Sequence, residues 1–130
     1  LAQEIVGATA VANRIRLQGG DFFKDALPSG DIYALGRIIH DWSVEKIKLL
    51  LNRIYAALPK GGAILIAEKL LADDKLGPRW AQMQSLNMLT CTEGKERTLA
   101  EYEALLTEAG FRDVRGCRTN SPLDTVIATK

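Results

Sequence analysis

The stretch that decides the fold is Pro59-Lys60-Gly61-Gly62-Ala63-Ile64-Leu65-Ile66-Ala67-Glu68. It begins with a turn that stops a helix and continues with an uninterrupted apolar run, Ala63 to Ala67. Apolar runs this short, entered from a glycine turn, suit a parallel strand that is buried on both faces. We therefore predict a buried strand over residues 63–67, with Glu68 just beyond its carboxyl end.

The residues before this turn predict a helix and two earlier strands. Apolar residues recur at the helical period over residues 44–58, and Ser43 is a suitable N-cap for that helix. Residues 31–35 form a strand candidate that follows a Pro-Ser-Gly turn, and residues 15–18 form a shorter one. Strands and helices therefore alternate in this half of the chain.

The residues after Glu68 predict two further helices. Pro78 opens the first, which runs to about residue 89, because proline is tolerated at the first helical position. A polar loop follows, and then Thr98 and Glu101 have the spacing of a capping box. The helix that they open is expected to end at Gly110.

The last two predicted strands, residues 111–117 and 123–129, follow one another directly around the turn Asn120-Ser121-Pro122. Alternating strands and helices imply crossovers and a mostly parallel sheet, whereas two consecutive strands can form an antiparallel hairpin on its edge. The sequence thus predicts an α/β fold. In such sheets the active site lies at the carboxyl ends of the strands.

The composition is that of an ordinary globular chain. The 130 residues are 47% hydrophobic and 25% charged, and 17 basic against 16 acidic residues leave a net charge of +1. Without a basic block we expect a small-molecule or protein partner, with no nucleic acid and no membrane. A single histidine and no Cys/His cluster argue against a zinc site, and no apolar run approaches the ~20 residues of a membrane span. A chain of 130 residues is long enough for one compact unit with one core, and we expect a cytoplasmic protein.

The chain opens with Leu1 rather than Met, inside a predicted helix over residues 1–12 that has no cap ahead of it. This start indicates an excised piece or a processed product.

Three ionisable side chains fall just after strand ends or in a nearby loop: His40, Glu68 and Glu96. A histidine can take a proton near neutral pH, and a carboxylate bonded to its other ring nitrogen would stabilise the charged form. A histidine paired with a carboxylate in this way can act as a general base that deprotonates a hydroxyl. A solitary histidine that caps the next helix, beside Asp41 and Trp42, explains the same residues equally well.

Four further residues admit a binding interpretation and a structural one. Asp21 and Phe22 follow Gly19-Gly20, where an acid can accept a hydrogen bond from an amine and a ring can stack on a flat base. A turn aspartate and a core phenylalanine account for them as well. Arg37 can neutralise a carboxylate or be solvated, and Asn87 can bind a ligand or lie on a polar helix face. A P-loop and a Gly-x-Ser-x-Gly motif are both missing.

Five motifs, in this order and spacing, resemble the class I S-adenosylmethionine-dependent O-methyltransferases of the acetylserotonin and caffeate type. They are Gly20-Asp21-Phe22-Phe23, His40-Asp41-Trp42, Pro59-Lys60-Gly61-Gly62 with Glu68, Leu86-Asn87-Met88-Leu89 with Thr92-Glu93-Gly94, and Gly94-Lys95-Glu96-Arg97-Thr98. The resemblance extends from about residue 19 to residue 129, and the fourth motif looks most similar to the acetylserotonin branch.

The resemblance implies that residues 1–130 are the C-terminal portion of an O-methyltransferase catalytic domain. The implied fold is a partial class I methyltransferase fold, a Rossmann-like, mostly parallel sheet with an antiparallel C-terminal hairpin. The family's first strands, glycine-rich cofactor loop, ribose-binding acid and N-terminal dimerisation domain have no counterpart in these residues, so we expect the chain alone to bind cofactor poorly. The implied cofactor is S-adenosylmethionine, contacted by Gly20, Asp21, Phe22 and Arg37. The full-length protein would be a homodimer.

The resemblance also implies an O-methyltransferase that acts on a small hydroxylated aromatic acceptor. His40 would be the general base, Glu96 would orient it, and Glu68 would be the second flanking carboxylate. The residues facing the acceptor would be Asp41, Asn87 and Cys91. The alternative is a methyltransferase-like domain without activity, kept for association or regulation; it is motivated by the missing cofactor loop and by Cys91, which stands where the acetylserotonin branch often carries a polar amide.

Overall fold

The structure is a computed structural model that describes residues 1–119 and 121–130, so Asn120 of the expected last turn lies outside the described residues. The strands are β1 (Ile32–Gly36), β2 (Ala63–Glu68), β3 (Arg112–Cys117) and β4 (Asp124–Thr129). The helices are α1 (Ala2–Gly7), α2 (Val44–Ala57), α3 (Arg79–Cys91) and α4 (Leu99–Glu108), with short 3₁₀ turns η1 (Ala12–Arg14) and η2 (Ile39–Asp41).

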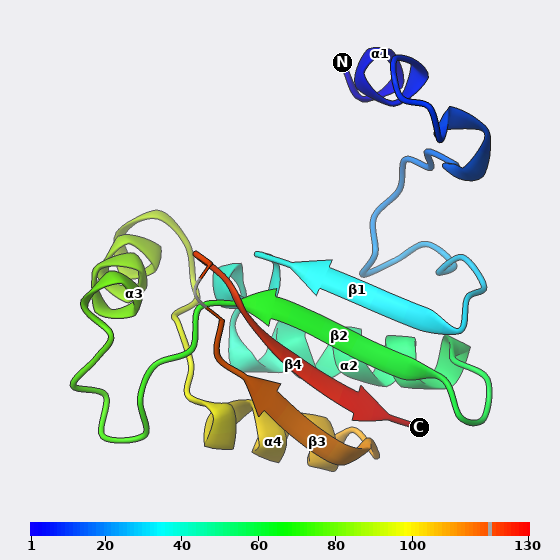
Figure 1. The fold of residues 1–130 in the computed structure, drawn as a ribbon. Helices are drawn as coiled ribbons and strands as arrows, with labels where there is room; N and C mark the ends of the chain where they lie inside the picture. The colour runs from blue at the N-terminus through cyan, green and yellow to red at the C-terminus, as the bar shows by residue number, and fades with distance from the viewer. Residues whose placement is uncertain (120) are drawn as a thin grey trace.

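The four strands form one mixed sheet in the order β1-β2-β4-β3 (Figure 1). β1 and β2 run parallel, as the intervening helix α2 predicted, and β4 pairs antiparallel with both β2 and β3. The predicted α/β class and C-terminal hairpin are thereby confirmed. The described strands make one parallel and two antiparallel pairings, so the sheet is mixed where a mostly parallel one was expected. The second strand of the hairpin lies inside the sheet and the first lies at its edge.

Helices α2 and α4 both lie against the same face of the sheet (Figure 1). The core between them includes Ile54 of α2, Leu106 of α4 and Ile66 of β2, each at most 1% exposed. Along β2 buried residues alternate with half-buried ones. The prediction that both faces of this strand are buried is therefore wrong, because among the described residues α2 and α4 cover one face only.

Local capping signals were read correctly from the sequence. The Ser43 hydroxyl accepts a hydrogen bond from the Lys46 N–H at 3.4 Å and begins α2. Thr98 and Glu101 form both hydrogen bonds of the capping box at the start of α4. Gly110 follows α4 with φ of +99°, the left-handed conformation that glycine adopts without strain.

The N-terminal predictions were wrong in part. Residues 15–18 form no strand, because a strand requires a hydrogen-bonded neighbour and none of the described residues pairs with them. The helix expected over residues 1–12 ends at Gly7, and η1 follows separately. No residue of α1 is buried, and the helix lies away from the sheet (Figure 1), so packing does not extend it.

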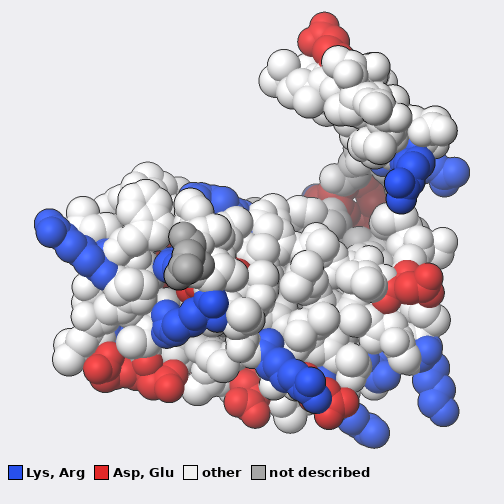
Figure 2. Space-filling view, viewed as in Figure 1, with Lys and Arg blue, Asp and Glu red and all other residues white. Residues whose placement is uncertain are grey.

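Charged side chains of both signs are interspersed over the face drawn in Figure 2, in keeping with the balanced composition. Among the described residues, none of the helices combines the length and the apolar character that crossing a membrane requires.

Candidate active site

The turn that carries His40 begins where β1 ends. Arg37 has φ of 54°, an uncommon conformation for a residue with a side chain, and it redirects the chain from the strand into η2. The Arg37 N–H donates to the Ala67 carbonyl at 3.1 Å, which ties this bend to the end of β2. His40 is thus held at the carboxyl ends of the two parallel strands, at 4% exposure.

The ring of His40 is paired with Glu96, which lies 56 residues away in the sequence. His40 Nδ1 lies 2.7 Å from Glu96 Oε1, and Glu96 is 1% exposed. When Nδ1 donates to this carboxylate, the neutral form of the imidazole has its lone pair on Nε2. Nε2 lies 3.6 Å from Asp41 Oδ1. The imidazole is thereby oriented with a free nitrogen that can accept a proton.

The electrostatic surroundings favour the protonated form of His40. Burial acts to lower the pKa of His40, but the hydrogen bond with Glu96 and the charges of Glu68, Glu96 and Asp41 together raise that pKa above its usual value. This environment strengthens the histidine as a base.

Glu68 contacts His40 through the backbone and not through the ring. Its Oε1 accepts hydrogen bonds from the N–H groups of Ile38 at 3.1 Å, Ile39 at 2.7 Å and His40 at 3.2 Å. Its Oε2 accepts a hydrogen bond from the Tyr102 hydroxyl. Burial raises the pKa of Glu68. The carboxylate therefore holds the turn that presents the histidine.

Arg97 holds the same turn from its carbonyl side. The guanidinium is buried and donates to the carbonyl oxygens of Ile39 at 3.3 Å, Trp42 at 3.3 Å and Lys95 at 3.0 Å. Arg97 belongs to the motif Gly94-Lys95-Glu96-Arg97-Thr98, but the sequence predicted no separate role for it. A charged residue directly before a capping box was the available signal, but it does not predict the partners Ile39 and Trp42, which lie 58 and 55 residues away.

Gly94 brings the loop before α4 against the histidine turn. A Cβ atom at this position would lie 2.1 Å from the His40 carbonyl oxygen and 2.7 Å from the Asp41 carbonyl carbon. Only glycine permits this approach of two backbones. The close contact places Glu96, two residues later, within reach of the imidazole.

The three residues expected to face the acceptor lie together. Asp41 and Cys91 line a cavity of about 320 Å³ with Trp42, Thr92 and Glu93. Asn87 lies one helical turn before Cys91 on α3, and its Oδ1 is 3.7 Å from Cys91 Sγ. Asp41 thus connects this cavity to the histidine, because its Oδ1 lies 3.6 Å from His40 Nε2.

Three of the four residues expected to contact the cofactor also lie together. Gly20, Asp21 and Phe22 line a second cavity of about 180 Å³. Asp21 accepts a hydrogen bond from the Phe23 N–H at 2.9 Å; this bond and the neighbouring Lys24 lower the pKa of Asp21, so it is ionised at neutral pH. Arg37 is exposed and is not among the residues that line this cavity.

The side chains of His40, Glu68 and Glu96 each offer one ligand atom within 4.8 Å of the others, a spacing that could hold a metal ion. The oxygens of Glu68, however, already accept from three backbone N–H groups and a tyrosine hydroxyl. The arrangement is that of a hydrogen-bonded network, in which Nδ1 of the histidine is also engaged.

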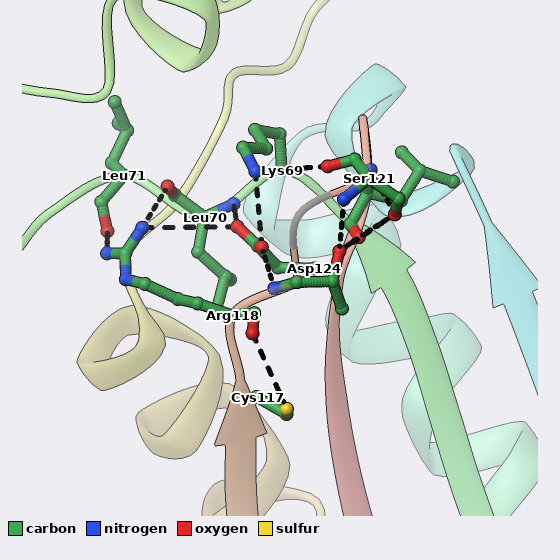
Figure 3. A network of polar contacts seen from close by, with 9 residues as sticks. Lys69, Leu70, Leu71, Cys117, Arg118, Ser121 and Asp124 are labelled. Carbon is green, nitrogen blue, oxygen red and sulfur yellow. Dashed lines mark hydrogen bonds and ion pairs between the residues drawn. The ribbon is translucent and has the colours of Figure 1, made fainter.

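A second buried network, centred on Asp124, fixes the chain directly after Glu68 (Figure 3). Asp124 accepts hydrogen bonds from the Thr119 N–H at 2.8 Å, the Leu70 N–H at 3.1 Å and Lys69 Nζ at 3.2 Å. The start of β4 therefore anchors the segment that leaves the end of β2.

Arg118 extends this network toward the histidine site. Its guanidinium donates to the carbonyls of Leu70 at 3.1 Å and Leu71 at 3.0 Å (Figure 3). The Leu71 N–H then donates to the Arg97 carbonyl at 3.0 Å. The loop that carries Glu96 and Arg97 is thus held by the hairpin at the far end of the chain.

Comparison with known proteins shows what this chain is similar to. A family profile described as an O-methyltransferase domain matches residues 1–112. Acetylserotonin O-methyltransferase from Bos taurus is 55% identical over 117 residues, 90% of this chain and 34% of that protein. The 3-hydroxy-5-methyl-1-naphthoate 3-O-methyltransferase of Streptomyces sahachiroi is 44% identical over 94% of this chain and 36% of that protein.

Solved structures of methyltransferases are also similar to this chain. Human N-acetylserotonin methyltransferase in complex with S-adenosylmethionine superposes with a TM-score of 0.86 at 50% identity, over 87% of this chain and 33% of that one. An O-methyltransferase family 2 protein from Planctomyces limnophilus in complex with apigenin gives a TM-score of 0.92 at 30% identity, over 99% of this chain and 39% of that one. The class I methyltransferase fold is thereby confirmed. The chain spans about a third of the length of the relatives that it matches.

Proposed function

The chain belongs to the family of O-methyltransferase domains, and from that premise we propose that the protein transfers a methyl group from S-adenosylmethionine to a hydroxyl of a small aromatic acceptor. The observation that carries the proposal is the 2.7 Å contact between His40 Nδ1 and Glu96 Oε1. It leaves Nε2 free to accept a proton beside a cavity. The names of the relatives, an acetylserotonin and a hydroxynaphthoate O-methyltransferase, support the reaction class.

In the proposed reaction, His40 Nε2 removes the proton of the acceptor hydroxyl. The acceptor oxygen then forms a bond to the methyl carbon, and the bond between that carbon and sulfur breaks. When bound, S-adenosylmethionine supplies the electrophilic methyl group. Glu96 holds the imidazole and stabilises its charged form until the proton passes to solvent. A positioned base of this kind contributes about 10²- to 10⁴-fold to a rate.

For the cofactor, we propose that Asp21 and Phe22 contact the adenine, with Gly20 allowing close approach of the backbone. An ionised carboxylate can accept a hydrogen bond from the amino group of adenine, and a half-buried ring can stack on the base. The residues that line the smaller cavity therefore fit an adenine. Arg37, exposed at the carboxyl end of β1, would contact the cofactor from the strand end.

For the acceptor, we propose the cavity lined by Asp41, with Asn87 and Cys91 at its α3 side. The Trp42 ring offers an apolar wall and Asp41 offers an acceptor for a hydrogen bond. This combination favours a small aromatic hydroxy compound over a nucleic acid or a membrane surface. The proposal also includes a cytoplasmic homodimer, the arrangement that the family resemblance implies.

The test measures methyl transfer by the full-length protein to a panel of hydroxyindoles and phenols, together with calorimetric binding of S-adenosylmethionine. We expect turnover by the wild type and a loss of about 10²-fold or more in kcat for Glu96→Gln, because the imidazole is no longer oriented or charge-stabilised. Glu103→Gln, an exposed position on α4, is the matched control and should keep full activity.

Two outcomes would count against this proposal. Full activity of Glu96→Gln would remove the assigned role of the His40–Glu96 pair. Cofactor binding without turnover on any acceptor would instead favour a methyltransferase-like domain with an association or regulatory role.

A further inference from the structure

Tyr102 is a buried side chain that the proposed chemistry has not used. It lies on α4 at 1% exposure, 34 residues from Glu68 in the sequence, and its hydroxyl donates to Glu68 Oε2. The other oxygen of that carboxylate accepts the three N–H groups at the start of the histidine turn. The tyrosine therefore reaches His40 through one intervening carboxylate.

We propose that Tyr102 is a positioning residue, whose hydroxyl holds the Glu68 carboxylate in the orientation that fixes the turn carrying His40. The inference rests on the proposed function of His40 as the base. Two residues then position the histidine from this part of the chain. Glu96, in the loop before α4, orients the ring, and Tyr102, within α4, fixes the backbone that carries the ring.

The geometry explains why a hydroxyl is needed at this position. A carboxylate bonded through one oxygen alone can rotate about its terminal torsion, which is broad and not strongly staggered. The bond to Tyr102 fixes the second oxygen, and the tyrosine itself is rigid because its ring packs in the core beside Leu105 and Leu106. A phenylalanine could occupy the same core space, so the hydroxyl serves Glu68 and not the packing.

The charges around this pair give the hydroxyl a second effect. Glu68 is faced by His40 from η2, by Glu96 from the loop before α4, and by Tyr102. Arg97 acts on Tyr102, whose pKa its charge lowers. Burial and the Glu68 charge raise the pKa of Tyr102 well above its usual value, so the hydroxyl keeps its proton and donates. Burial raises the pKa of Glu68, and the bond from Tyr102 opposes that increase.

Removal of the hydroxyl should therefore change how His40 titrates. Without the bond from Tyr102, the pKa of Glu68 rises further and its ionised form is less favoured. The Glu68 charge is one of the causes that raise the pKa of His40, beside Glu96 and Asp41. The pKa of His40 should consequently fall.

The experiment compares wild type with Tyr102→Phe in the full-length protein. We expect kcat to fall about 10- to 100-fold, as for other residues that orient an active-site group, while binding of S-adenosylmethionine and KM for the acceptor stay unchanged. The acid limb of the kcat/KM profile should move to lower pH. Tyr55→Phe on α2, whose ring packs against Phe111, is the matched control and should change neither property.

Two further measurements separate this role from folding and from the proposed function. In a Glu68→Gln background, Tyr102→Phe should have little additional effect on kcat, since the tyrosine acts through that carboxylate. The pKa of His40, read from its ring protons by NMR and assigned with His40→Gln, should be lower in Tyr102→Phe whether or not an acceptor is turned over.

An unchanged His40 pKa in Tyr102→Phe, or additive losses in the double variant, would overturn the proposal and leave Tyr102 as a core residue only. If the wild type methylates no acceptor but the NMR shift appears, the proposed function fails and the positioning role stands.

Discussion

At the scale of single residues, the site depends on a few buried polar groups that contact one another, and Glu96 Oε2 is the one buried side-chain oxygen among the described residues without a hydrogen-bond partner. His40, Glu68, Glu96 and Arg97 are each at most 4% exposed, yet charges of both signs meet there and most of their polar atoms are hydrogen-bonded. Buried charges are costly unless they are paired, so removal of one partner costs more than the same change at the surface. A substitution that moves or removes one of these residues is therefore expected to affect its buried partners as well.

Gly94→Ala is expected to impair both stability and activity. The added Cβ would lie 2.1 Å from the His40 carbonyl oxygen, so one of the two backbones must move and carry Glu96 or His40 with it. Overpacking of this kind costs about 1–3 kcal/mol, which chemical denaturation would measure as a lower free energy of unfolding.

The matched control is Gly7→Ala, where an added Cβ meets no atom within 4 Å. It should leave stability and activity unchanged. A Gly94→Ala variant as stable and active as wild type would show that the two backbones can separate without consequence.

At the scale of elements, local signals account for the helices and distant partners account for the strands. The caps at Ser43 and Thr98 join residues three positions apart, and both were predicted from the sequence. The strand expected at residues 15–18 is absent because strand formation depends on a neighbour that local sequence does not name. The Asp124 network also belongs to this scale, since it joins the ends of β2, β3 and β4 (Figure 3).

Asp124→Asn is expected to lower stability at neutral pH and to make stability less sensitive to acid. Burial acts to raise the pKa of Asp124, but hydrogen bonds from the Thr119 and Leu70 N–H groups and from Lys69 lower it overall. A lowered native pKa contributes stability above the unfolded value of 3.8, and this contribution is lost as the pH falls through the native value.

The measurement is urea denaturation of wild type and Asp124→Asn at a series of pH values from neutral to acidic. The difference in unfolding free energy should be largest at neutral pH and shrink in acid. Asp73→Asn, at an exposed position, is the control and should follow the wild type. A difference that stays constant with pH would mean that the Asp124 charge does not contribute.

At the scale of the whole molecule, the site is built from elements spread over the chain. His40 follows β1, Glu68 ends β2, Glu96 and Arg97 precede α4, and Tyr102 lies within it. The proposed acceptor cavity adds the end of α3. The proposed cofactor cavity is lined by residues from 18–28, and its volume of about 180 Å³ is smaller than the ~300–1,000 Å³ of usual ligand sites.

Residues 1–130 alone are therefore expected to bind S-adenosylmethionine weakly, because too little of the cofactor would be enclosed. Calorimetric titration measures this directly, with bovine acetylserotonin O-methyltransferase, which is 55% identical over the matched region, as the positive control. Tight stoichiometric binding by residues 1–130 would show that the remaining walls of the site are not needed.

We could predict from the pattern along the chain the helices α2 and α4 with their caps, the positions of the strands β1 to β4, the α/β class and the motifs that gather around His40. Periodicity and capping depend on residues three or four positions apart, and such patterns can be read along a chain. Tertiary structure was needed to place β4 between β2 and β3, to bury one face of β2 and to bring Glu68 and Arg97 to their backbone partners. The contacts of Glu68 span 28 to 30 residues and two contacts of Arg97 span 55 and 58 residues, so their geometry exists only once the sheet and its helices have packed.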